Sequence, residues 1–148
     1  MKRFALLGLA PVVLSVSVAA AAEKHAPLSI QTLTSAEARF GDGPEDSVKV
    51  AHIYGDPDKD GMFVMWMKMP AGAQTPPHWY ASDKIFTVLS GSIGLGLGDT
   101  FDENAGKEIQ AGGFAVIPAK AHHFGWSKDG ALIQVQGMGP FKMHWLEP

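Results

Sequence analysis

The sequence predicts an all-β domain, either a sandwich or a barrel, on three observations. From residue 48 onward, short runs rich in β-branched and aromatic residues recur along the chain. Sets of turn-forming glycine, proline, serine and aspartate residues separate these runs. No window shows the sustained period of an amphipathic helix. The chain of 148 residues is long enough for one domain with a real core, and a second domain is not expected.

Eight strands are expected along this part of the chain. Their ranges are 48–54, 62–69, 85–89, 93–97, 114–117, 122–126, 131–135 and 141–146. Turn-forming sets such as Gly55-Asp56-Pro57 lie between them. Residues 100–107 are polar and are interpreted as a surface loop. Many short strands at this spacing favour a closed or two-layered sheet.

Residues 1–22 are interpreted as a secretory signal peptide. Two basic residues precede an uncharged apolar run that begins at Phe4, and Glu23 ends it after a run of alanines that includes residues 20–22. Cleavage is therefore expected just before Glu23, which makes the protein periplasmic or secreted. The alternative is a retained membrane anchor, which is disfavoured because Gly8 and Pro11 interrupt the run.

The expected mature protein begins with an arm over residues 23–47, followed by a barrel domain over residues 48–148. The arm shows no sustained period and could add an edge strand or a turn. Removing Lys2 and Arg3 from the 12 basic residues leaves 10 against 15 acidic ones, a net charge of about −5. This balance argues against nucleic acid or an anionic membrane as a partner. Cysteine is absent, so histidine, tyrosine, lysine and carboxylates must carry any chemistry.

Four residues from two segments are candidates for a functional site. His78 and Tyr80 are two residues apart, so in an extended segment their side chains face the same side. Lys84 follows a bend and is expected to return beside them. His123 comes from a neighbouring strand, and imidazoles that converge from different strands can hold a divalent ion. The spacing therefore predicts that these four side chains meet at one end of the barrel.

Both segments resemble the two sequence motifs of the cupin superfamily. The first motif contains a glycine, His-x-His, a glutamate and a closing glycine, in whose places stand Gly72, His78, Tyr80, Lys84 and Gly91. The second runs from a glycine to Pro-x-Gly-x-x-His, in whose places stand Gly113, Pro118, Lys120 and His123. The resemblance implies a single-domain jelly-roll barrel, or double-stranded β-helix. It also implies one metal ion held by three histidines and a carboxylate.

This chain keeps only half of the metal ligands that the resemblance implies, His78 and His123. Tyr80 replaces a histidine, and Lys84 replaces the carboxylate. A protonated ammonium repels a divalent cation and offers it no lone pair. A phenolate can bind ferric or cupric ions, and a nearby ammonium favours the loss of its proton. Tyr80 and Lys84 are thus candidates either for a tuned phenolate with catalytic roles or for a metal-free hydrogen-bonded couple.

Three polar or aromatic residues are further candidates for substrate binding. Gln134 and Gln136 share one face of a strand, and the resemblance implies that such pairs often line the ligand cavity. Trp66, on the strand expected at residues 62–69, is the third.

Met65, Met67 and Met69 share one face of the strand expected at residues 62–69. Thioethers suit copper(I), but core packing is the stronger explanation for this row. His122 is expected to point away from its neighbour His123.

Two functions from different classes remain open. The first is a metal-dependent enzyme that uses iron, manganese, copper or zinc in oxidative cleavage, isomerisation or lyase chemistry on a small molecule. The second is a non-catalytic small-ligand or sugar-binding module that has lost its metal. Exposed edge strands make a homodimer possible.

Overall fold

The computed structural model describes residues 29–146, so the expected signal peptide lies outside the described residues. These residues form nine strands and one short 3-10 turn. In chain order they are β1 Lys49–Tyr54, β2 Gly61–Met69, β3 Ala73–Tyr80, β4 Lys84–Leu97, η1 Glu103–Ala105, β5 Gly106–Gln110, β6 Phe114–Ile117, β7 His123–Ser127, β8 Ala131–Gly139 and β9 Met143–Trp145. Within residues 29–146, no helix has the length and apolar character needed to cross a membrane.

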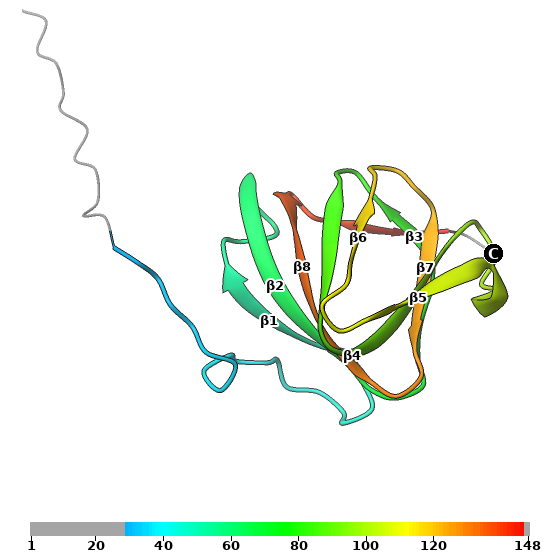
Figure 1. The fold of residues 1–148 in the computed structure, drawn as a ribbon. Helices are drawn as coiled ribbons and strands as arrows, with labels where there is room; N and C mark the ends of the chain where they lie inside the picture. Colours follow the sequence, from blue (N-terminus) through cyan, green and yellow to red (C-terminus); the bar gives the residue numbers. More distant parts are fainter. Residues whose placement is uncertain (1–28, 147–148) are drawn as a thin grey trace, which may run out of the picture. The chain divides into compact units, whose positions relative to one another are not determined.

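All strand pairs are antiparallel, and β4 joins two groups of strands. The first half of β4 pairs with β8 and β6, and β8 continues through β2 to β1. The second half of β4 pairs with β7 and β5, and β7 continues through β3 to β9. Figure 1 shows the strands curling around a common interior, with β2 and β8 on one side and β3 and β7 on the other. The architecture is the jelly-roll barrel that the sequence predicted.

Two bulges set which residues of β3 and β4 point inward. In β3 the register shifts between Thr75 and His78, at two prolines that cannot donate to a ladder. In β4 it shifts just after Val88. Gly91 lies three residues further on with φ +72°, and a Cβ there would lie 2.2 Å from the Gly130 oxygen, so only glycine fits. Each bulge therefore changes the face that odd-numbered and even-numbered residues occupy.

The barrel interior is mainly apolar and comes from both sides of the sheet. Its buried residues are Phe63, Met65, Met69, Phe86, Val88, Ile93, Ile117, Ala131, Ile133 and Val135. On β8, Ile133 and Val135 are almost fully buried, whereas Gln134 and Gln136 between them are only partly buried. This alternation identifies the inward face of β8.

The structure differs from the sequence prediction at three places. The runs at 85–89 and 93–97 are one bent strand, β4, because the bulge bends the chain without ending its pairing. The polar segment 100–107 contains η1, and its end enters β5. The proline-containing strand β3, which carries His78 and Tyr80, is not among the eight predicted ranges. Of the two alternatives for the arm, its described part, residues 29–47, contains turns and no strand.

Candidate functional site

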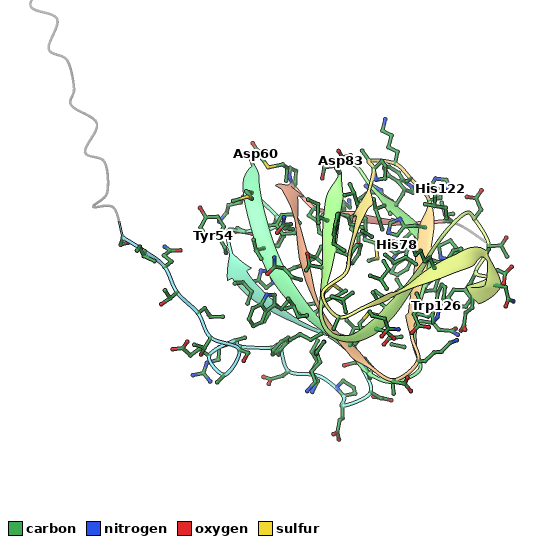
Figure 2. All side chains as sticks on the ribbon, in the orientation of Figure 1. Tyr54, Asp60, His78, Asp83, His122 and Trp126 are labelled. Carbon is green, nitrogen blue, oxygen red and sulfur yellow. The ribbon has the colours of Figure 1, made fainter. Side chains whose placement is uncertain are left out.

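The structure brings His78, Tyr80, Lys84 and His123 together in one small cavity inside the barrel. All four side chains are buried, with between 1 % and 6 % of their surface exposed. The ring centroids of His78 and His123 are 4.2 Å apart, and those of His78 and Tyr80 are 5.2 Å apart. His78 and His123 are direct partners in the register of β3 and β7. Figure 2 shows His78 among the side chains that the strands enclose.

Both imidazoles are held in one orientation by the backbone. The Nδ1 atom of His78 lies 2.8 Å from the Pro76 oxygen, and that of His123 lies 2.9 Å from the Ala121 oxygen. A carbonyl oxygen only accepts, so each Nδ1 must carry the proton, and each neutral ring keeps a lone pair on Nε2. The Nε2 atom of His123 is buried and has no hydrogen-bond partner among the described residues. This tautomer, fixed by a backbone carbonyl, is the form in which histidine binds metals.

Burial keeps both imidazoles neutral. It lowers the pKa of His78 to about 4, with a smaller contribution from the charge of Lys84, although the hydrogen bond to Pro76 acts in the opposite direction. Burial and then the charge of Lys84 lower the pKa of His123 to about 3. At neutral pH, both rings therefore have a free lone pair.

Lys84 is buried without a charged partner. Its Nζ atom lies 3.6 Å from the centroid of the Tyr80 ring and 4.7 Å from that of Phe86. No ion pair or hydrogen bond of this amine is found among residues 29–146, and the carboxylate of Asp83 accepts from the Ala119 N–H instead. Burial lowers the pKa of Lys84 to about 6, so the amine is mostly neutral at neutral pH.

Tyr80 packs as a protonated phenol. Its ring stacks on Phe141 with centroids 4.1 Å apart and planes 7° apart. Burial raises the pKa of Tyr80, and Lys84 lies over the face of the ring. The site therefore does not favour the metal-binding phenolate that the sequence left open, because the cost of burying the anion is the dominant effect.

The donor set fits a metal ion through its two imidazoles. Among the described residues, no group of three or more histidine, cysteine, aspartate or glutamate side chains is placed to hold one. Apart from the four site residues, the cavity is lined mainly by apolar side chains, including Met65, Met67, Met69 and Met143. The cavity has a volume of about 40 Å³. That volume accommodates one or two water molecules or a metal ion.

The three expected substrate-binding residues lie elsewhere. Trp66, Gln134 and Gln136 alternate with inward residues and occupy the outer face of β2 and β8. There the Trp66 Nε1–H donates to Gln134 Oε1 at 3.1 Å, and the Gln134 amide donates to Gln136 Oε1 at 3.1 Å. Gln134 and Gln136 therefore do not line the barrel cavity, because the apolar residues between them occupy that face. A role of the three residues in binding a substrate stays a prediction.

Sequence reasoning missed two neighbours of the site, Phe141 and Met143, which both line the cavity. They are two residues apart in the run predicted at 141–146, so their shared face was the available signal. His122 points away from His123 as expected, with its Nδ1 atom 2.6 Å from Asp99 Oδ1. In Figure 2, His122 lies nearer the rim than His78.

The fold is similar to those of several solved proteins, all of low sequence identity. KdgF from Halomonas sp. is 18% identical with a TM-score of 0.58, covering 75% of this chain and 96% of that one. An RmlC-like cupin from Shewanella frigidimarina NCIMB 400 is 13% identical with a TM-score of 0.59, covering 74% and 91%. The polyketide cyclase RemF from Streptomyces resistomycificus is 17% identical with a TM-score of 0.64, covering 81% and 87%. No family model and no curated protein matches the sequence. The likeness shows that this chain has the cupin fold.

Proposed function

We propose that this protein is a metal-dependent enzyme that acts on a small organic molecule, with His78 and His123 as the protein ligands of the metal. One observation carries this proposal: both imidazoles present Nε2 to one cavity, and the buried Nε2 of His123 has no partner among the described residues. Leaving a buried polar atom unpaired costs about 1–3 kcal/mol of stability, and an ion bound to that atom would remove this cost. Such an ion can polarise a carbonyl or activate oxygen or water.

Lys84 and Tyr80 supply the proton-transfer groups in this proposal. In this proposal the unpaired Lys84 amine accepts a proton from a substrate and the Tyr80 hydroxyl donates one; both residues line the cavity, which supports these roles. A base and an acid side by side suit isomerisation or elimination as well as oxidative cleavage. Because the cavity holds only about 40 Å³, the reacting part of the substrate must be small, or the Tyr80 and Phe141 rings must move apart to admit more.

Export is part of the proposal, since the apolar run after Lys2 and Arg3 suits a signal peptide. Mass spectrometry of protein recovered from outside the cytoplasm should find a mature N-terminus at or close to Glu23. Recovery with Met1 intact would contradict this localisation.

Elemental analysis of protein purified from its native compartment tests the metal assignment. Wild type should carry about one equivalent of a transition metal, whereas the variants His78→Ala and His123→Ala should lose it. The matched control is His122→Ala, because His122 is adjacent in sequence but pairs with Asp99 outside the cavity. If the His123→Ala protein retains its metal at the wild-type level, His123 is not a ligand.

A metal-free binding module is the second candidate, and Lys84 is the observation that favours it. The amine stands where the resemblance implies a carboxylate, and when protonated it opposes a divalent cation. Wild type that is isolated without metal and binds none on addition would favour this candidate. Its ligand would have to be far smaller than a sugar unless the cavity opens, since ligand pockets usually enclose about 300–1,000 Å³.

A further inference from the structure

We propose that the ion preferred by this cavity is copper(I), held by the Nε2 atoms of His78 and His123 and by thioether sulfur from the methionines that face them. This inference rests on the proposed function, because it assigns the metal of the same site. The observations behind it are the methionines on the opposite wall of the cavity and the charge of the lining residues.

The methionines of the chain are concentrated at this cavity. Four of its seven methionines line it, namely Met65, Met67, Met69 and Met143. The first three are the inward-facing residues of β2 after Phe63, and Met143 lies on β9 beside β3. The other two methionines of the described residues, Met62 and Met138, are more than half exposed on the surface. These methionines also pack in the core, and unlike leucine or valine at such positions they bring sulfur atoms to this wall.

Nitrogen and sulfur donors reach the cavity from the two sides of the barrel. His78 and His123 come from β3 and β7, which are hydrogen-bonded neighbours, whereas Met65, Met67 and Met69 come from β2 on the other side. An ion beside the two imidazoles would therefore have thioethers as candidate ligands across the cavity. Imidazole together with thioether is a soft donor set that suits copper(I), whereas manganese and magnesium prefer oxygen.

The charge of the lining favours a monovalent ion over a divalent one. Among residues 29–146, no aspartate or glutamate lines the cavity, and imidazoles whose Nδ1–H donates to a backbone carbonyl are neutral donors, as thioethers are. The one remaining ionisable amine, that of Lys84, contributes zero or positive charge. The Born cost of burying an ion grows with the square of its charge, so an uncompensated divalent cation costs about four times as much as a monovalent one. A site without a carboxylate offers a divalent ion no compensating charge, which favours copper(I) over divalent ions at this cavity.

Metal competition on stripped mature protein tests the assignment. Copper(I) is added without oxygen in the presence of a chromophoric copper(I) chelator, and zinc(II) and manganese(II) are titrated by calorimetry. We expect one copper(I) per chain, bound at least 100-fold more tightly than zinc(II). Equal or tighter binding of zinc(II) would overturn the inference.

Leucine substitutions isolate the contribution of sulfur. The variant Met65→Leu/Met67→Leu/Met69→Leu should lose at least tenfold in copper(I) affinity, while its weak affinity for zinc(II) stays unchanged. The control variant Met62→Leu/Met138→Leu changes two exposed methionines and should bind copper(I) like wild type. Circular dichroism and thermal melting show whether each variant folds. If the triple variant does not fold, the three single variants replace it.

X-ray absorption at the copper edge of loaded wild type gives an independent readout, because it needs no variant. Both nitrogen and sulfur neighbours are expected, and a spectrum with nitrogen or oxygen alone would refute thioether ligation. The outcomes separate the two proposals. Binding of zinc(II) or manganese(II) that depends on His78 and His123, with weak copper(I) binding, would keep the proposed function and reject this inference. Absence of binding for every metal would reject both.

Discussion

Both faces of strand β7 are buried, but one faces the cavity and the other lies under aromatic rings. Its inward side carries His123 and Gly125 into the cavity, where an imidazole nitrogen has no partner among the described residues. Its outward side carries Phe124 and Trp126, which are 0 % and 4 % exposed. The rings of these two residues pack with Phe101, from the loop before η1, at centroid distances of 5.2 and 6.1 Å. One short strand thus faces a cavity lined by two histidines and a lysine on one side and an aromatic layer on the other.

The aromatic layer is packed onto bare backbone. A Cβ on Gly94 would lie 1.9 Å from the Trp126 ring, and one on Gly96 would lie 2.2 Å from the Phe124 ring. Gly94 and Gly96 of β4 therefore cannot be replaced by a residue with a Cβ unless the rings that cover them move. The outer side of β7 provides tight packing, which contributes stability. The inner side leaves a cavity beside the unpaired Nε2 atom of His123, at a cost in stability. The outer side has a buried atom without a partner among the described residues as well, Trp126 Nε1, but no cavity beside it is described.

The largest expected effect comes from restoring the two residues that the resemblance implies on the inner face. The double variant Tyr80→His/Lys84→Glu gains a third imidazole and a carboxylate and loses a potential like charge. It should bind zinc(II) or manganese(II) more tightly than wild type by several kcal/mol, or more than about a hundredfold. Each single variant should give a part of this gain, with non-additive energies, because both residues address one ion. Calorimetry on the four stripped proteins measures it. No gain in the double variant would mean that position 84 does not reach the metal.

The next effect concerns the cost of burying Lys84 and its dependence on pH. Burial lowers the pKa of Lys84 in the folded protein to about 6 from its ordinary value of 10.5. Between these pH values the unfolded chain therefore binds a proton that the folded protein does not. The free energy of unfolding should therefore rise with pH across this window. The groups facing the amine are Tyr80, His78 and His123, and the lining contains no carboxylate.

Replacing Lys84 should remove the free-energy cost of burying its amine and the rise in stability with pH. Lys84→Met should stabilise the stripped protein by about 1–4 kcal/mol at pH 7 and flatten the rise between about pH 6.5 and 9. Urea unfolding at several pH values measures both quantities. The control is Lys68→Met, because Lys68 is exposed on β2 and its loss should leave the slope intact. An unchanged slope in Lys84→Met would show that the amine is not buried as described.

A smaller effect tests the tight packing of the outer face. Gly94→Ala places a methyl group inside the Trp126 ring, so the ring must shift and stability should fall by about 1–3 kcal/mol. Gly41→Ala is the control, because the nearest atom to its Cβ would be 3.8 Å away and its stability should change by less than about 0.5 kcal/mol. Thermal unfolding compares the two. Equal melting temperatures would show that the outer layer has room that the structure does not indicate.

The smallest effect separates the outer face of β2 from the site. Trp66→Phe removes the hydrogen bond to Gln134 and should cost about 0.5–1.5 kcal/mol of stability. Metal affinity should not change, because Trp66 does not line the cavity. Parallel melting and metal titration measure the two quantities. A large fall in metal affinity would return Trp66 to the list of functional residues.

Local sequence determined most of the strands and the shared face of His78 and Tyr80, because two-residue spacing is a local property. The two motifs that resemble those of cupins predicted that Lys84 and His123 would join them, and the pairing of β3 with β7 brings His123 there. Tertiary structure decided which residues point inward and which protonation state the buried groups have. The bulges in β3 and β4 reset which residues point inward, and the depth of burial fixed the protonation of Tyr80 and Lys84. An alternating strand has two faces, and only packing against the other strands places Gln134 outside and Ile133 inside. Protonation and orientation both depend on residues distant in sequence, since desolvation and contact are properties of the folded chain.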